Sequence, residues 1–218
     1  MKDYIIIDFD STFIKIESLD QLLKTTSARN KDSLIKIQKL TDMGMNGEIS
    51  FQKSLSERIK LLNSNKNDLD IVIDIINKNV SDSFKKNKKF INENNDKIII
   101  ISGGFYELIY PVVSKFGIKK ENIFANTFIY DKDGKIIGVD KNNPLSKNNG
   151  KVKTIKNLNL DGNVIVIGDG YTDYEIKKYG YANKFYLFIE NIKRKNILDK
   201  GDFLLKSLDD FIDIYNNE

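Results

Sequence analysis

The chain has 218 residues, of which 40% are hydrophobic and 30% charged, and it contains only two prolines. That composition is typical of an ordinary soluble globular protein and excludes a disordered or fibrous chain. Cysteine and histidine are both absent. Their absence excludes disulfides, thiol nucleophiles, Ser-His and Cys-His catalytic systems and imidazole-ligated metal sites, so any hydrolytic chemistry must use carboxylates, lysines, hydroxyls and oxygen-bound metal.

The net charge of +4 and the pI near 8.9 come from lysines that are scattered beside acidic residues. No DNA- or RNA-binding motif accompanies them, so we expect no nucleic-acid partner, whereas an anionic small substrate fits this charge. The first apolar run is well short of a signal-peptide core of about 7–15 residues, and no run approaches a membrane span of about 20. We therefore expect a cytoplasmic protein with no membrane partner, either a monomer or a homodimer.

Short β-branched runs, each bounded by polar or glycine-rich residues, predict four buried strands at Tyr4–Ile7, Lys97–Ile101, Ile123–Ala125 and Val164–Ile167. Three of them lead into helical patterns. Strands buried on both faces that alternate with helices indicate an α/β fold with a doubly wound parallel sheet. Between Phe128 and Val139 two alternating runs flank an Asp-Gly pair, which predicts a β-hairpin appendage.

The segment between the first two strands has a helical period of Leu and Ile, interrupted once near Gly44 and Gly47. A simple crossover between parallel strands needs far fewer residues. We therefore predict a helical domain at residues 16–89, inserted into a core domain formed by residues 1–15 and 90–218.

Asp8 and Asp10 follow the first predicted strand, at the edge where open α/β sheets bind ligands. If the strand continues through them, their side chains face the same way. An isolated pair of this kind is equally compatible with two acids in a turn that Ser11 and Thr12 cap.

Ser102, Gly103 and Gly104 follow the second long strand and precede an amphipathic run at Phe105–Phe116. A hydroxyl and free backbone N–H groups at a helix N-terminus form a good anion site. A tight turn at a helix start explains the same residues equally well.

Asp169 and Asp173 lie on a glycine-rich stretch after another strand, where two carboxylates can approach Mg²⁺ while Asp8 supplies a further oxygen. A capped Asp-Gly turn is the alternative. Lys151, at the start of a helical stretch, could offset the charge between carboxylates and a phosphate, although an exposed lysine is common in this chain. The three strand-end sites converge at one edge of the predicted sheet, which favours a functional site.

These motifs resemble those of the haloacid-dehalogenase superfamily, and within it those of the phosphoserine phosphatases. The resemblance covers most of the chain and includes stretches outside the motifs. The matching segments are Asp8-Phe9-Asp10-Ser11-Thr12, Met45-Asn46-Gly47-Glu48-Ile49-Ser50-Phe51, Leu55-Ser56-Glu57-Arg58, Ser102-Gly103-Gly104, Asn122-Ile123-Phe124-Ala125-Asn126, Lys151 and Gly168-Asp169-Gly170-Tyr171-Thr172-Asp173.

The resemblance implies a Mg²⁺-dependent phosphomonoesterase in which Asp8 attacks phosphorus and becomes an aspartyl-phosphate. It implies that Asp10 protonates the leaving group and later activates water, and that Lys151 stabilises charge on the phosphoryl group. The implied metal ligands are Asp8, the backbone carbonyl of Asp10, and Asp169, with Asp173 in support. The implied phosphate and substrate contacts are Ser102, Gly103 and Thr172.

By the same resemblance the helical insert is a cap that closes over the site. Glu17 on it would meet a substrate ammonium and Arg58 a substrate carboxylate, with Met45 and Phe51 lining the pocket. The expected reaction is hydrolysis of L-phosphoserine, and another small phosphorylated metabolite is the alternative. The stretch 181–195 and Tyr171 depart from the better-known phosphoserine phosphatases. A signalling receiver domain is opposed by the early position of Asp8 and by the long insert.

Overall fold

The computed structural model describes residues 2–26 and 31–217. Its centre is a six-stranded sheet in the order β3-β2-β1-β6-β7-β8, in which every neighbouring pair is parallel. The strands are β1 (Asp3–Ile7), β2 (Ile98–Phe105), β3 (Ile123–Asn126), β6 (Asn163–Gly168), β7 (Lys184–Phe188) and β8 (Phe203–Leu205). The predicted doubly wound parallel sheet and its four predicted strands are confirmed, because β1, β2, β3 and β6 coincide with them.

Both faces of the sheet are buried, and alternate residues of each central strand belong to different cores. On β1, Ile5 and Ile7 join the larger apolar cluster, whereas Ile6 joins the second cluster on the opposite face. Ile98 and Ile99 of β2 divide in the same way. This two-sided burial is why the strands are continuous β-branched runs with no polar alternation.

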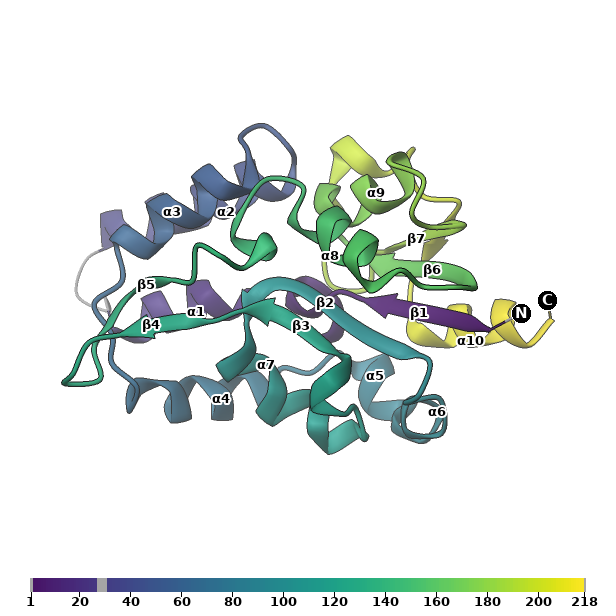
Figure 1. The fold of residues 1–218 in the computed structure, drawn as a ribbon, viewed down its shortest axis with the longest axis horizontal. Coiled ribbons are helices and arrows are strands. Elements are labelled where there is room, and N and C mark those ends of the chain that lie inside the picture. Colours follow the sequence, from purple (N-terminus) through teal and green to yellow (C-terminus); the bar gives the residue numbers. More distant parts are fainter. Residues whose placement is uncertain (1, 27–30, 218) are drawn as a thin grey trace.

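Helices lie on both faces of the sheet (Figure 1). One face is covered by α8 (Gly150–Leu158) and α9 (Tyr171–Lys178). The other is covered by α5 (Asp82–Lys86), α6 (Lys88–Glu93), α7 (Tyr106–Val113) and α10 (Leu208–Asn217). The helix expected after Ser102–Gly104 is α7, which begins at Tyr106 because β2 continues to Phe105.

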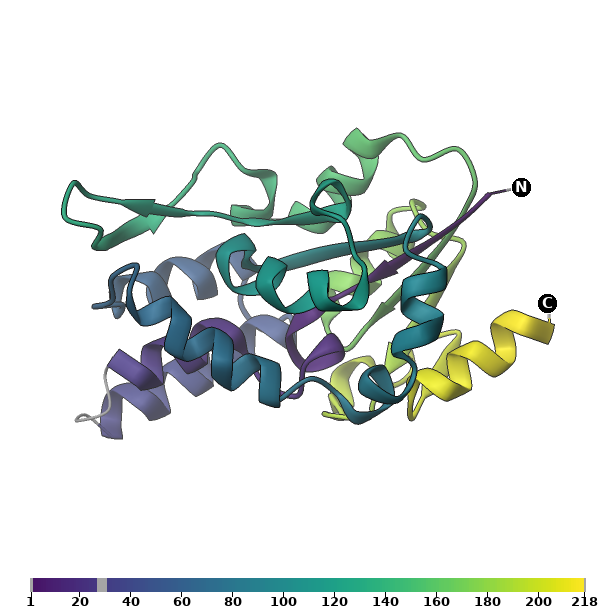
Figure 2. The ribbon, with the colours of Figure 1, turned by 90° about the horizontal axis from the view of Figure 1, so that it is seen from below.

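Four further helices occupy the segment between β1 and β2, in agreement with its predicted helical period (Figures 1 and 2). They are α1 (Ser18–Thr26), α2 (Lys31–Met45), α3 (Phe51–Lys60) and α4 (Asp68–Lys78). The segment that leaves the core before α1 and the segment that returns to it after α4 lie side by side, because Ile14 and Val80 form an isolated antiparallel bridge. The division into domains at residues 16 and 89 stays a prediction.

The predicted hairpin is also confirmed, as β4 (Phe128–Tyr130) and β5 (Ile136–Val139) pair in antiparallel fashion. Its tip reaches the helical insert. Ile136 N–H donates to the Ser64 carbonyl at 2.9 Å, and Lys66 N–H donates to the Gly134 carbonyl at 2.9 Å. The hairpin therefore contacts the loop between α3 and α4.

β7 and β8 were not predicted from sequence. The β7 segment KFYLF lacks the β-branched residues of the other strands, and β8 has only three residues. The pairing of β7 with β6, and of β8 with β7, is decided by the sheet rather than by local preference. Within residues 2–26 and 31–217, no helix combines the length and the apolar character that crossing a bilayer requires.

Candidate active site

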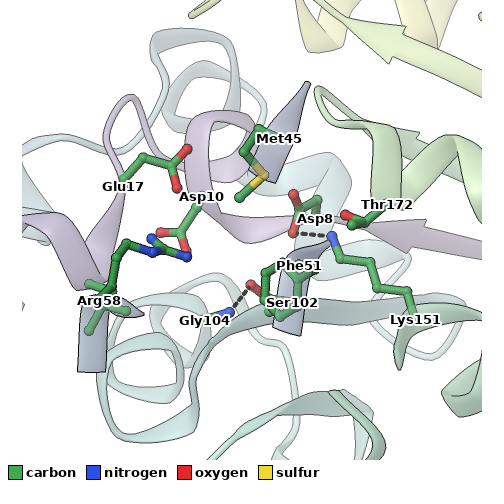
Figure 3. Close-up of a pocket in the computed structure, with 12 residues that line it drawn as sticks. Asp8, Asp10, Glu17, Met45, Phe51, Arg58, Ser102, Gly104, Lys151 and Thr172 are labelled. Atoms are coloured by element: carbon green, nitrogen blue, oxygen red, sulfur yellow. Dashed lines mark hydrogen bonds and ion pairs between the residues drawn. The ribbon is translucent and has the colours of Figure 1, made fainter. Parts of the chain in front are cut away.

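A small cavity lies between the carboxyl ends of β1, β2 and β6 and the helices α1, α2 and α3 (Figure 3). All ten residues predicted as catalytic or substrate-binding line it, together with Leu19 and Gly104. The ten are Asp8, Asp10, Glu17, Met45, Phe51, Arg58, Ser102, Gly103, Lys151 and Thr172. The predicted convergence of three strand ends therefore occurs, and residues of the helical insert complete the cavity.

Asp8 and Asp10 are brought together by a turn and not by a shared strand face, so that expectation was wrong. β1 ends at Ile7, and the chain enters a turn over Phe9–Phe13 that the Ile14 N–H closes by donating to the Phe9 carbonyl at 3.0 Å; within it Asp10 is extended and Ser11 has a left-handed backbone (φ 55°). Such a conformation is rare for a residue with a side chain and is found most often at functional sites. The turn directs Asp10 toward α1, where its carboxylate accepts the Ser18 N–H at 2.7 Å.

The Lys151 ammonium lies between two buried carboxylates, at 2.7 Å from Asp8 Oδ1 and 2.7 Å from Asp173 Oδ1. Asp8 Oδ1 also accepts the Phe9 N–H, so both described contacts of the Asp8 carboxylate use the same oxygen. Burial alone would lower the pKa of Lys151, but Asp173 and Asp8 outweigh it and raise that pKa. Lys151 is therefore a fixed positive charge beside Asp8, not a solvated lysine.

Asp8, Asp169 and Asp173 each place a carboxylate oxygen within 4.8 Å of the other two. Burial raises the pKa of Asp169 and Asp173, and the neighbouring charge of Asp8 adds to both shifts. A divalent cation would remove this repulsion, and Mg²⁺ prefers carboxylate oxygens. The residues therefore fit the predicted cation, whereas the Asp10 carboxylate faces Ser18 and leaves only its backbone carbonyl for such a role.

Ser102–Gly104 form the irregular end of β2 and not a helix N-terminus, because the pairing with β3 shifts register between Ile101 and Phe105. Ser102 Oγ accepts the Gly104 N–H at 3.0 Å, and Asn126 Nδ2 donates to the Gly103 carbonyl at 2.9 Å. Gly103 has no room for a side chain, since a Cβ there would overlap the Phe51 ring. Phe51 thus lies directly on this strand end.

Glu17 faces the cavity from the start of α1, where Ser11 Oγ donates to it at 2.7 Å (Figure 3). Burial raises the pKa of Glu17 well above its usual value, and the charges of Asp10 and Asp169 add to the shift. Burial likewise raises the pKa of Asp10 to about 7, with a contribution from Asp8. This side of the cavity therefore favours a proton or a bound cationic group.

Arg58 reaches the cavity from α3 and is 4% exposed. Its Nη1 donates to Asp20 Oδ1 at 3.1 Å and to Thr41 Oγ1 at 3.1 Å. Both partners belong to the helical insert, so the guanidinium is held before any ligand arrives. Neither Asp20 nor Thr41 was singled out from the sequence.

Arg194 is the main residue of the site that sequence reasoning missed. Its Nε donates to Asp169 Oδ2 at 2.8 Å, and its Nη2 lies 3.4 Å from Glu17 Oε1. Nη1 is 3.8 Å from Asp42 on α2. The sequence did offer a signal for Arg194. The chain has only three arginines, at 29, 58 and 194, among its many lysines, so each arginine stands out as a candidate for a specific role.

The segment just before Arg194 contacts both stretches of chain that link the sheet to helices α1–α4, the one that leaves the sheet and the one that returns to it. Asn191 Nδ2 donates to the carbonyls of Ser11 and Thr12 and to Ser81 Oγ. Glu190 accepts the backbone N–H and the hydroxyl of Ser83. Residues 181–195, which depart from the better-known phosphoserine phosphatases, therefore contact the turn that directly follows Asp8.

Comparison with known proteins agrees with this geometry. A family model described as haloacid dehalogenase-like hydrolase matches residues 5–176. A chloroplastic phosphoserine phosphatase of Arabidopsis thaliana is 30% identical over 208 residues, which span 94% of this chain and 69% of that protein. A phosphoserine phosphohydrolase-like protein of Francisella tularensis has a similar structure, with a TM-score of 0.89, 33% identity and coverage of 98% of this chain and 99% of that one. A phosphoserine phosphatase solved as an analogue of the phospho-aspartyl intermediate gives a TM-score of 0.78 at 25% identity, over 98% of both chains.

Proposed function

We propose that this chain, which belongs to the haloacid dehalogenase-like hydrolase family, converts L-phosphoserine to L-serine and phosphate. The chain is a phosphoric monoester hydrolase, and the proposed reaction passes through an aspartyl-phosphate on Asp8. One observation carries the choice of substrate. Glu17, whose buried carboxyl group favours a cationic partner, and Arg58, which is cationic, line the same cavity as the Asp8–Asp10 pair. Such a cavity suits a phosphate ester that also carries an ammonium and a carboxylate.

Asp8 is the proposed nucleophile. Its carboxylate is buried at the end of β1, and Lys151 and the Phe9 N–H hold Oδ1, which leaves Oδ2 to attack phosphorus. A carboxylate nucleophile divides a slow hydrolysis into the formation and the breakdown of an acyl phosphate. Lys151 keeps the attacking group oriented and carries positive charge beside the phosphoryl oxygens.

Asp10 is the proposed general acid and base. Its pKa of about 7, raised by burial, allows it to hold a proton for the leaving serine oxygen and then to accept one from water. The Ser18 N–H fixes the carboxyl group at 2.7 Å, so the side chain is already oriented. Asp8 and Asp10 therefore have different tasks because their surroundings differ.

The strand end at Ser102 and Gly103 is the proposed phosphate contact, with Thr172 as a further residue that lines the same cavity. Asp8, Asp169 and the Asp10 carbonyl, supported by Asp173, would hold Mg²⁺. When bound, Mg²⁺ would neutralise phosphoryl charge as a Lewis acid. Thr12 Oγ1 and Arg194 orient Asp169 for this role, at 3.2 Å and 2.8 Å.

The helices α1–α4 are the proposed cap over this cavity. Contacts cross from the cap to the sheet domain, since Phe51 lies on Gly103 and Gln52 N–H donates to Asn148 Oδ1 at 3.3 Å. A closed cap excludes water from the acyl phosphate and brings Glu17 and Arg58 to the substrate. Met45 and Phe51 supply the apolar walls.

Two variants test the proposal with purified protein and Mg²⁺. Asp8→Asn should lose turnover by roughly 10⁴-fold or more, with an unchanged circular dichroism spectrum, because the nucleophile is gone. Retained turnover in this variant would refute the mechanism. Comparison of L-phosphoserine with a panel of phosphate esters, in the native enzyme and in Arg58→Ala, tests the substrate. Full phosphoserine activity in Arg58→Ala would refute the assignment and favour another small phosphorylated metabolite.

A further inference from the structure

A buried polar network joins three helices of the cap at Arg58. Asp20 on α1 and Thr41 on α2 are each 1% exposed, and Arg58 on α3 is 4% exposed. Thr41 Oγ1 lies 2.9 Å and 2.7 Å from the two oxygens of Asp20, and Arg58 Nη1 lies 3.1 Å from both Asp20 Oδ1 and Thr41 Oγ1. Each member of the network contacts the other two.

The network uses only one end of the guanidinium. Both described contacts fall on Nη1, and Nε is buried with no hydrogen-bond partner among the residues the structure describes. The rest of the group faces the cavity, where Figure 3 shows Arg58 directed toward Asp10. Asp20 and Thr41 thus hold the guanidinium through Nη1, while its other N–H groups remain available to a planar anion.

Helix packing alone does not account for this network. A buried ion pair contributes little net stability compared with apolar side chains of similar volume, because desolvation offsets the attraction between the charges. The surrounding cap core is apolar, with Leu19, Leu23 and Leu55 buried nearby on the same helices. Two buried polar groups at this one point, Asp20 and Thr41, both contact Arg58, which indicates a role in placing that side chain.

We infer that Asp20 and Thr41 are positioning residues that hold Arg58 ready for the substrate carboxylate and so contribute to substrate selectivity. This inference rests on the proposed function, since it assigns the carboxylate to Arg58. A free arginine would lose rotamer freedom when the substrate binds, whereas the network fixes it beforehand. Ordering one long side chain corresponds to roughly a two- to tenfold difference in affinity.

The test compares O-phospho-L-serine with O-phosphoethanolamine, which has the phosphate and the ammonium but no carboxylate. The ratio of the two kcat/KM values reports carboxylate recognition alone. In Thr41→Val and Asp20→Asn we expect this ratio to fall about fivefold, through KM for phosphoserine, whereas phosphoethanolamine turnover changes little. Thr41→Ser retains the hydroxyl and should restore the native ratio.

Ser54→Ala is the matched control. Ser54 is also a buried cap hydroxyl, and its Oγ donates to the Leu40 carbonyl at 2.7 Å, so it links α3 to α2 through a hydrogen bond that does not involve the Arg58 guanidinium. Its loss should leave the ratio unchanged. If Thr41→Val and Ser54→Ala both reduce the two substrates equally, the network is only structural and the inference is wrong.

Arg58→Ala separates the two hypotheses. If this variant leaves the ratio unchanged, the proposed substrate assignment fails and the inference fails with it. If Arg58→Ala abolishes the preference for phosphoserine but Thr41→Val and Asp20→Asn keep or increase it, the proposed function stands and only the inference is overturned.

Discussion

Arg194 offers a sharp test of how charge is balanced in this site. Its side chain is 3% exposed, and its two shortest contacts with acids join Nε to Asp169 at 2.8 Å and Nη2 to Glu17 at 3.4 Å. Arg194→Met keeps most of the volume but removes the charge, which leaves a buried Asp169 carboxylate with the Thr12 hydroxyl and without its cation. Removing one partner of a buried ion pair costs about 3–5 kcal/mol.

The measurement is the free energy of unfolding in a chelator, followed by circular dichroism in denaturant. A loss of about 3 kcal/mol corresponds to a fall in Tm of roughly 6–12 °C for a chain of this size. Repeating the melt with excess Mg²⁺ should reduce the difference between variant and native protein, because the cation compensates Asp169 in place of the arginine. In an Asp169→Asn background the effect of Arg194→Met should shrink as well, since the charge left unpaired is gone.

Lys193→Met is the control, because Lys193 is the exposed neighbour of Arg194 and loses the same charge. Its stability should change by no more than about 0.5 kcal/mol. A loss below about 1 kcal/mol in Arg194→Met, or an equal loss in the two variants, would refute the view that Arg194 balances the buried carboxylates.

The other predictions concern chemistry, space and metal. Asp10→Asn should slow phosphoserine hydrolysis by roughly 10²–10⁴-fold but p-nitrophenyl phosphate much less, because nitrophenolate leaves without a proton; equal losses would contradict the acid role. Gly103→Ala should raise KM at least severalfold, since the new methyl overlaps the Phe51 ring, whereas Gly138→Ala on β5, with open space around its Cβ position, should retain native kinetics. Chelation should abolish turnover, and Mg²⁺ at about 100 times its Kd should restore it and stabilise the fold by about 2.7 kcal/mol, which a thermal melt can check.

Strong local patterns made much of the sheet predictable. The runs around Ile5, Ile99 and Val166 are β-branched on both faces, so each could only be a strand covered on two sides, and the polar residues after them had to meet at one edge. β7 was not predicted because KFYLF shows neither the alternation of apolar and polar residues nor the β-branched run that marks a strand. Its place in the sheet follows from hydrogen bonding to β6. The continuation of β2 through Ser102–Gly104 was not predicted, because local preference does not reveal the irregular pairing of β2 with β3.

The order of residues along the chain determined which chemical groups this protein has: no imidazole, no thiol, carboxylates after two apolar strands and a serine with two glycines after a third. Tertiary structure decided which groups meet. Arg194 reaches Asp169 and Glu17, and Asp20 reaches Arg58, across separations of 25, 177 and 38 residues. Sequence periodicity reports only on neighbours within a few positions, whereas the pairing of buried charges depends on distances that arise only when the helical insert folds over the sheet.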